Sequence, residues 1–172
     1  MFGIGPRVAG AVIGFAFLAA GGAIVGASWS HAQGPASATA MICRTEAIHE
    51  IDSAVGVQAT VSRPAWSDHR YSCTYRYPSG SMRLSVKELP DLQQTGVYYH
   101  QLQAGMGDTG GVSNLGQGAF RTTNGSIVVR KDSKVLLVDV TGLPAEFGQP
   151  PTTSGNVALT VADVILACWS GD

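Results

Sequence analysis

The side chains that could do chemistry in this chain are three cysteines, four histidines and five tyrosines. The histidines are scattered singly, and the residue four places after His49, where a helical zinc motif has its second histidine, is Ser53. Residues 105–110 match the letters G-x-G-x-x-G of a dinucleotide-binding loop. That loop needs a strand before it and a helix after it, whereas here a helix precedes and a loop or strand follows. We therefore interpret the segment as a flexible loop. We predict no metal, no cofactor and no catalytic residue, and expect a protein that is not an enzyme.

The cysteines predict one disulfide and one thiol, and three pairings are open. We expect Cys43 to pair with Cys73, because Cys73 alternates with Tyr71 and Tyr75 on the inward face of a strand, and Cys43 enters the helix that should cover that face. The pairings of Cys168 with Cys43 or with Cys73 remain alternatives. If Cys168 is the free thiol, it continues the apolar stripe of the last helix and packs there as a small hydrophobic residue.

The tyrosines could line an apolar pocket. Tyr71, Tyr75 and Tyr77 share one face of the predicted strand 70–77, and Tyr99 lies on a helical pattern. Phenol rings offer both a stacking surface and a hydroxyl group, which suits a ligand-binding cleft. Alternating tyrosines are also typical of ordinary sheet packing, so a ligand-facing role and a packed core are both open.

An apolar segment stands at the N-terminus. Arg7 is the only charged residue before Arg44, and residues 8–27 are almost wholly apolar. Such a segment is either a signal peptide cleaved before Gln33 or an uncleaved anchor, with Trp29 at the membrane interface. Both interpretations place the rest of the chain on the extracytoplasmic side. It is attached to the cell membrane in one case and secreted in the other.

The chain divides into three parts by composition. They are a signal peptide or membrane anchor at 1–32, which contacts the membrane through residues 8–29, a flexible linker at 33–42, and an extracytoplasmic domain at 43–172. Beyond the leader, ten Lys and Arg (eleven less Arg7) stand against twelve Asp and Glu, a formal charge of −2. No basic stripe is visible, so we expect no nucleic acid as partner.

The elements that must position these residues follow from hydrophobic periodicity. A helical pattern ends at Gly56, a second helix begins after the capping residue Asp91, and a third follows Thr153 or Ser154. Alternating or β-branched segments predict strands at 57–62, 70–77, 82–87, 119–122, 126–129 and 135–141. Asn124-Gly125 indicates a two-residue hairpin turn. The fold class is α+β, an antiparallel sheet of about six strands covered by three helices in the order α-βββ-α-βββ-α.

Three short motifs carry a resemblance to a known family. Cys43 precedes the first helix, Cys73 lies in Tyr71-Ser-Cys73-Thr-Tyr75, and Leu115-Gly-Gln-Gly-Ala-Phe120 precedes a hairpin and an apolar strand. With these motifs the chain resembles small actinobacterial exported lipoproteins and anchored proteins of unknown function, which are similar in layout to PsbP-like α/β/α domains. The resemblance covers residues 43 to about 169. The chain lacks the lipid-attachment cysteine that many members have. The resemblance implies a fold and a compartment, and no activity.

These observations lead us to expect a non-enzymatic accessory or interaction domain at the cell envelope, with another envelope protein as its partner in a membrane complex. The alternative is a carrier or sensor of a small apolar ligand that is held by the aromatic residues. A third hypothesis, thiol chemistry at an unpaired Cys168, lacks a C-x-x-C partner.

Overall fold

A computed structural model describes residues 34–169 of the 172-residue chain. The predicted leader, its alternative cleavage site and Trp29 lie outside the described residues. Between residues 34 and 169, no helix is both long enough and apolar enough to cross a membrane.

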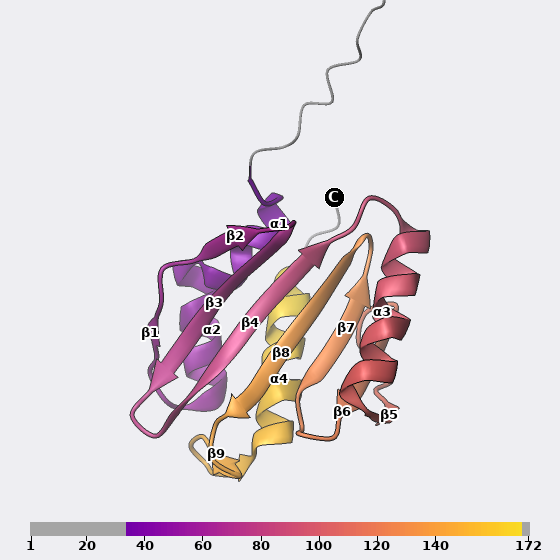
Figure 1. Cartoon of the computed structure of the whole chain (residues 1–172). Helices are drawn as coiled ribbons and strands as arrows, with labels where there is room; N and C mark the ends of the chain where they lie inside the picture. The colour runs from indigo at the N-terminus through magenta and orange to yellow at the C-terminus, as the bar shows by residue number, and fades with distance from the viewer. Residues whose placement is uncertain (1–33, 170–172) are drawn as a thin grey trace, which may run out of the picture. The chain divides into compact units, whose positions relative to one another are not determined.

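The described residues form an α+β fold around one antiparallel sheet of eight strands (Figure 1). The strand order is β1-β3-β4-β8-β7-β6-β5, and β2 also pairs with β3. The helices are α1 (Ser37–Ala40), the 3-10 helix η1 (Met41–Cys43), α2 (Thr45–Val55), α3 (Leu92–Met106) and α4 (Ser154–Cys168). The strands of the sheet are β1 (Thr60–Val61), β2 (Ala65–Ser67), β3 (Arg70–Tyr77), β4 (Gly80–Glu88), β5 (Asp108–Gly111), β6 (Gly118–Thr122), β7 (Ile127–Lys131) and β8 (Lys134–Gly142), and β9 (Glu146–Phe147) pairs separately with β10 (Thr152–Thr153).

Two blocks of strands join at the centre of the sheet. Hairpins connect β3 to β4 and β7 to β8, and β8 returns to lie antiparallel to β4. The predicted α+β class and antiparallel sheet are therefore confirmed. The expected number of strands is too low, because the short strands β2 and β5 lack an alternating apolar pattern and form only against a longer neighbour.

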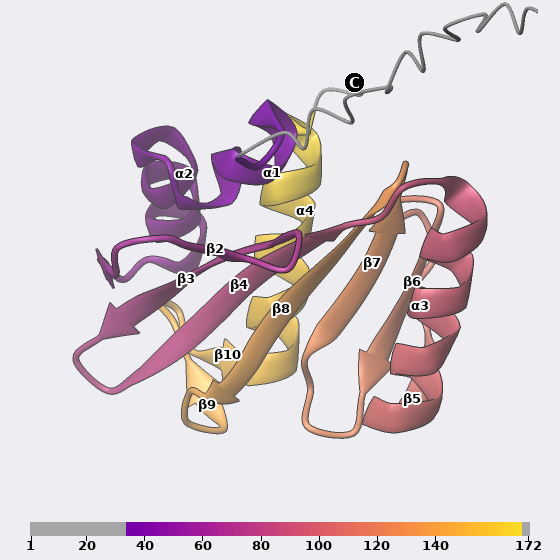
Figure 2. The same ribbon diagram turned by 45° about the horizontal axis from the view of Figure 1, so that its top comes forward.

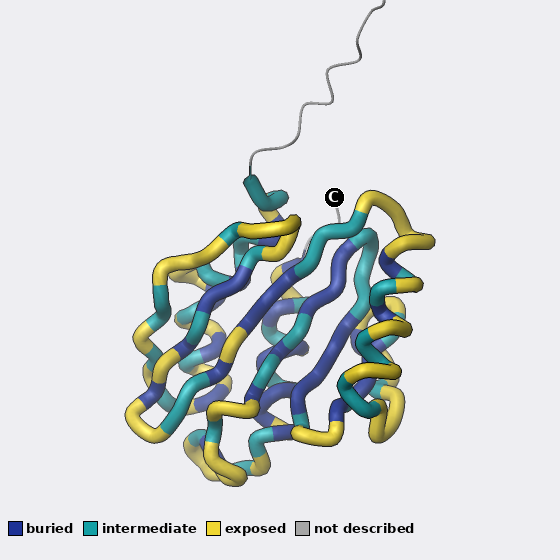
Figure 3. The backbone as a smooth tube through the Cα atoms, in the orientation of Figure 1, coloured by how far each residue is buried: buried dark blue, intermediate teal, exposed yellow. Residues whose placement is uncertain are grey.

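The sheet has two unequal apolar layers. Helices α2 and α4 cover one face, where the main core gathers around side chains such as Tyr75, Leu84 and Val138, all fully buried. Helix α3 lies on the opposite face, as the two views show (Figures 1 and 2), and packs over a smaller cluster that includes Tyr99 and Phe120. Residues of the central strands are mostly buried, whereas many residues along α3 are exposed (Figure 3).

The disulfide joins Cys43 to Cys73, with the two Cα atoms 6.0 Å apart, which confirms the expected pairing. The expectation of a flexible linker over 33–42 is wrong for residues 37–42, which form α1 and η1. Ile42 is fully buried, and its carbonyl oxygen accepts a 2.7 Å hydrogen bond from the Tyr75 hydroxyl. The small residues before Ile42 have little helical signal of their own, so this segment folds because it is tied to β3.

The predicted helix ends are also confirmed. Gly56 has φ +73° and ends α2 in the left-handed conformation, which a glycine adopts without a Cβ clash. The Asp91 side chain accepts a 2.7 Å hydrogen bond from the backbone N–H of Gln94 and so caps α3. Thr153 caps α4 in the same way, through the N–H of Asn156.

The turn between β6 and β7 is longer than predicted. Three residues, 123–125, separate Thr122 from Ser126, and only Gly125 has a positive φ, +85°. A two-residue turn of the expected type needs a positive φ at both Asn124 and Gly125. Instead, the Asn124 carboxamide oxygen accepts hydrogen bonds from the Thr122 hydroxyl and from the Ser126 N–H, and these stabilise the longer loop.

The segment 105–110 is not the flexible loop that we expected. Gly105 and Met106 belong to α3, and Asp108–Gly111 forms β5, which pairs with β6 at the edge of the sheet. Helix α3 comes directly before these glycines and strand β6 follows β5, so the segment lacks the strand-loop-helix context of a dinucleotide-binding loop.

The expectation that Cys168 packs inward is wrong. The Cys168 side chain is exposed, and Trp169 occupies the next buried position, four residues after Ile165. The Trp169 carbonyl oxygen accepts a 2.8 Å hydrogen bond from Lys131. Because Trp169 ends the apolar stripe, the preceding residue turns toward solvent.

Candidate functional site

The outer face of the sheet, opposite α2 and α4, is only half covered. Helix α3 contacts β6, β7 and β8 on this face, and a groove of about 270 Å³ runs beside it over β3, β4 and β8. We call it the basic groove. It is lined by Arg70, Arg83, Ser85, Lys87, Tyr98, Leu102, Val135, Leu137 and Asp139.

Strand register arranges the floor of the basic groove in three rows. One row contains Arg70, Lys87 and Val135, the middle row Ser72, Ser85 and Leu137, and the third Thr74, Arg83 and Asp139. Adjacent strands are about 4.8 Å apart and successive rows about 7 Å apart. The cations therefore lie on β3 and β4, and the apolar residues lie on β8, next to α3.

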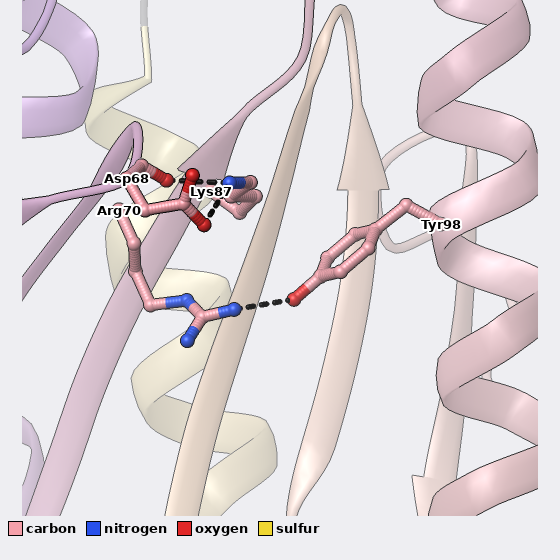
Figure 4. A network of polar contacts seen from close by, with 4 residues as sticks. All are labelled: Asp68, Arg70, Lys87 and Tyr98. Atoms are coloured by element: carbon pink, nitrogen blue, oxygen red, sulfur yellow. Dashed lines mark hydrogen bonds and ion pairs between the residues drawn. The ribbon is translucent and has the colours of Figure 1, made fainter.

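The two arginines of the groove are held by neutral groups. Arg70 Nη2 donates a 2.9 Å hydrogen bond to the Tyr98 hydroxyl, which extends from α3 toward the sheet (Figure 4). Arg83 Nη2 donates a 3.2 Å hydrogen bond to the Ser72 hydroxyl in the middle row. Neither guanidinium lies within ion-pairing distance of a carboxylate among residues 34–169. Each guanidinium therefore has N–H donors that these hydrogen bonds do not use, and the positive charge of Arg70 also helps to lower the pKa of the Asp68 carboxyl.

The third cation is paired. Lys87 Nζ lies 2.8 Å from Asp68 Oδ2 and also donates to the Asp68 backbone carbonyl oxygen (Figure 4). The hydrogen bond from Lys87, followed by its positive charge, lowers the pKa of the Asp68 carboxyl below its ordinary value. The Asp68 side chain is 82% exposed, so this pair is a surface ion pair at the rim of the groove and contributes little to stability.

Two further polar groups line the groove. Asp139, opposite Arg83 on β8, accepts hydrogen bonds at Oδ1 from the backbone N–H and the hydroxyl of Thr141, at 3.0 and 2.7 Å. Ser85 is 9% exposed, and its hydroxyl has no hydrogen-bond partner among residues 34–169. The Ser85 hydroxyl oxygen is not among the fully buried atoms that lack a partner, so it is open to the groove and can donate to a ligand there.

Helix α3 supplies the apolar wall. Tyr98 and Leu102 lie one helical turn apart and border the groove, together with Val135 and Leu137 of β8. The helix is fixed to the sheet by Tyr99, whose ring contacts Phe120 edge to face with centroids 5.3 Å apart. The Arg130 guanidinium lies 5.7 Å from the centroid of the same ring. The groove therefore has a cationic side and an apolar side.

The tyrosines named from the sequence do not meet in one cleft. Tyr75 and Tyr77 are buried in the main core beneath α2 and α4, and Tyr71 is partly buried against it. Burial raises the pKa of both core phenols above the ordinary value. Tyr99 is buried on the opposite face of the sheet. These rings act as packing groups on two separate faces.

The remaining reactive groups do not form a second site. The Cys168 thiol borders a shallow hollow with Met41, Arg44 and Glu46. Within residues 34–169, no three His, Cys, Asp or Glu side chains are close enough together to hold a metal ion.

Comparison of the chain with protein-family models, with curated proteins and with solved structures found no match. The resemblance to exported actinobacterial proteins remains an expectation, and a function has to be argued from the geometry of the domain.

The basic groove was missed by reasoning from the sequence, although part of its signal was visible. The outward positions of the paired strands carry Arg70, Ser72, Arg83, Ser85 and Lys87, all basic or hydroxyl-bearing. The domain has a net negative charge, and a net charge does not reveal a local cluster of basic residues. The position of α3 beside it was not readable, because periodicity does not say which face of a sheet a helix covers.

Proposed function

We propose that residues 34–169 form a non-enzymatic accessory domain on the extracytoplasmic side of the cell envelope, and that the domain binds an anionic group of a partner through the basic groove. The observation that carries this proposal is the pair Arg70 and Arg83. Both line an open groove, and the hydrogen bonds that both guanidinium groups make within residues 34–169 go to neutral hydroxyls. A guanidinium is well suited to a carboxylate or phosphate, which it can bind through two parallel hydrogen bonds.

The compartment and the membrane attachment belong to the same proposal. The apolar segment 8–27 and the disulfide between Cys43 and Cys73 both support export. The partner is an envelope protein or another envelope molecule with a negative charge. The alternative role of a carrier is supported by the apolar wall of the groove, and not by the tyrosines of the main core.

Affinity purification of the full chain from native membranes tests the binding function, with mass spectrometry of the proteins and lipids that co-purify. The groove variant Arg83→Gln is compared with Arg76→Gln, which removes an equal charge from an exposed residue of the same strand pair. We expect the bound molecules to be lost from Arg83→Gln and kept in Arg76→Gln. An unchanged set in both variants contradicts the proposal.

The exposed Cys168 thiol gives a test of the compartment. A maleimide that does not cross the cytoplasmic membrane should label the wild-type chain in intact cells and should not label Cys168→Ser. Labelling that appears only after lysis places the domain in the cytoplasm. The intact mass of the recovered chain then separates anchor from signal peptide, because a chain that begins near Gln33 has lost its leader.

A further inference from the structure

The lining of the basic groove restricts the ligand more narrowly than charge alone. We propose that it binds a small amphipathic monocarboxylate, with the carboxylate between Arg70, Arg83 and Ser85 and the apolar part against Leu102 and Leu137. This inference rests on the proposed function, since it specifies the anion that the same groove receives.

The polar end of the ligand is defined by N–H and O–H groups of the groove that are not used in hydrogen bonds within the domain. Arg70 and Arg83 each use one N–H on a neutral hydroxyl, and the Ser85 hydroxyl between them is unpartnered within the described part of the chain. Arg70 and Arg83 lie two rows apart, and the Arg83 guanidinium already reaches Ser72 in the middle row, where Ser85 also lies. A carboxylate accepts hydrogen bonds from several directions, so in the middle row it can accept from Arg83 and Ser85, with Arg70 as the second positive charge of the groove.

The charge of the groove favours one negative charge over two. Lys87 is already neutralised by Asp68, which leaves two arginines opposed by Asp139 in the row of Arg83. An anionic group placed on the β8 side in the row of Arg83 would lie near the Asp139 carboxylate, and the two like charges would repel each other. A ligand with a single carboxylate, held on the side of the arginines, avoids this repulsion.

The apolar end follows from the opposite wall. Leu137 and Leu102 are half-buried and keep apolar surface open to the groove, whereas Val135, at 2% exposed, adds little. A fully hydrated ion would leave this surface in contact with water, whereas an alkyl or aryl group would remove it from water. The wall lies one to two strand spacings from the arginines, about 5–10 Å, which suits a short alkyl chain.

Octanoate is the probe that combines both features. Three further probes separate them: acetate has the charge without the chain, octan-1-ol the chain without the charge, and inorganic phosphate is a hydrophilic anion. Binding to the full chain is read from the methyl NMR signals of Val135 and Leu137, so that probe dissolved in lipid or detergent does not contribute. We expect saturable octanoate binding, and affinities at least about tenfold lower for the other three probes.

Two matched pairs of variants locate the two ends of the ligand. Arg83→Gln and Leu102→Gln should each weaken octanoate binding by about tenfold or more. Arg76→Gln and Leu92→Gln make the same chemical changes at exposed positions outside the groove and should have no effect. Thermal unfolding of each variant confirms that it is folded.

The outcomes separate the two proposals. If acetate or phosphate binds as tightly as octanoate and depends on Arg83, the amphipathic ligand is wrong and anion binding stands. If octan-1-ol equals octanoate and Arg83→Gln has no effect, or if no anion binds, both proposals are wrong.

Discussion

Removal of the disulfide between Cys43 and Cys73 should lower the free energy of unfolding by a calculable amount. The bridge closes a loop with a sequence separation of 30 residues. The chain-entropy model gives about 3.6 kcal/mol for a loop of this length. With a urea dependence of about 2 kcal/mol per M, the unfolding midpoint should fall by roughly 2 M. The bridge also fixes η1 and the buried Ile42 against β3, so the loss should be accompanied by fraying of residues 37–43.

The assay is urea unfolding of the full chain in a Cys168→Ser background, which removes the exposed thiol that could exchange with the bridge. Three samples are compared: oxidised chain, the same chain with reductant, and the double variant Cys43→Ala/Cys73→Ala. The reduced chain isolates the effect of the crosslink, and the double variant adds the packing lost at Cys73, which is 3% exposed. A loss below about 1 kcal/mol on reduction would refute the entropic argument.

Two further predictions use matched substitutions and urea unfolding. Tyr75→Phe removes the buried 2.7 Å hydrogen bond to the Ile42 carbonyl and should cost about 1–2 kcal/mol, whereas Tyr77→Phe should be neutral or stabilising, because the buried Tyr77 hydroxyl has no partner among the described residues. Equal losses in the two variants would contradict this account of the core. Gly56→Ala should cost more than about 1 kcal/mol, because φ is +73° and the added Cβ would overlap the carbonyl of the 149–150 peptide. Gly105→Ala, in a helix with open space around the added Cβ, should stabilise the domain by about 0.5 kcal/mol, and a destabilised Gly105→Ala would show that helix propensity does not govern this position.

Local signals were sufficient for much of the fold. The alternation over 70–77 and 82–87 defines β3 and β4 and also places Cys73 on the inward face, which is why the disulfide could be predicted. Other elements depend on partners that are distant in sequence. The segment 37–42 folds only because Ile42 is held against β3, and β5 forms only beside β6.

In the candidate site, too, some features follow from local sequence signals and others depend on residues that are distant in sequence. The outward positions of Arg70, Arg83 and Lys87 are readable from alternation, but their alignment into rows depends on strand register, and the apolar wall depends on the position of α3. The orientation of Cys168 could not be predicted from the apolar stripe of the last helix either. The next buried residue after Ile165 is Trp169, one residue beyond Cys168.

The most direct measurement of the central claim compares the affinity for octanoate of two double variants of the full chain. Arg70→Gln/Arg83→Gln removes two charges from the basic groove, and Arg63→Gln/Arg76→Gln removes two charges from exposed positions outside it. The net charge is the same in both. We predict that the groove variant loses binding by about 100-fold or more, because two charged hydrogen-bond donors are removed, and that the control variant binds like the wild type. Equal losses in the two variants would show that net charge alone attracts the anion, and no loss in the groove variant would show that the groove is not the binding site.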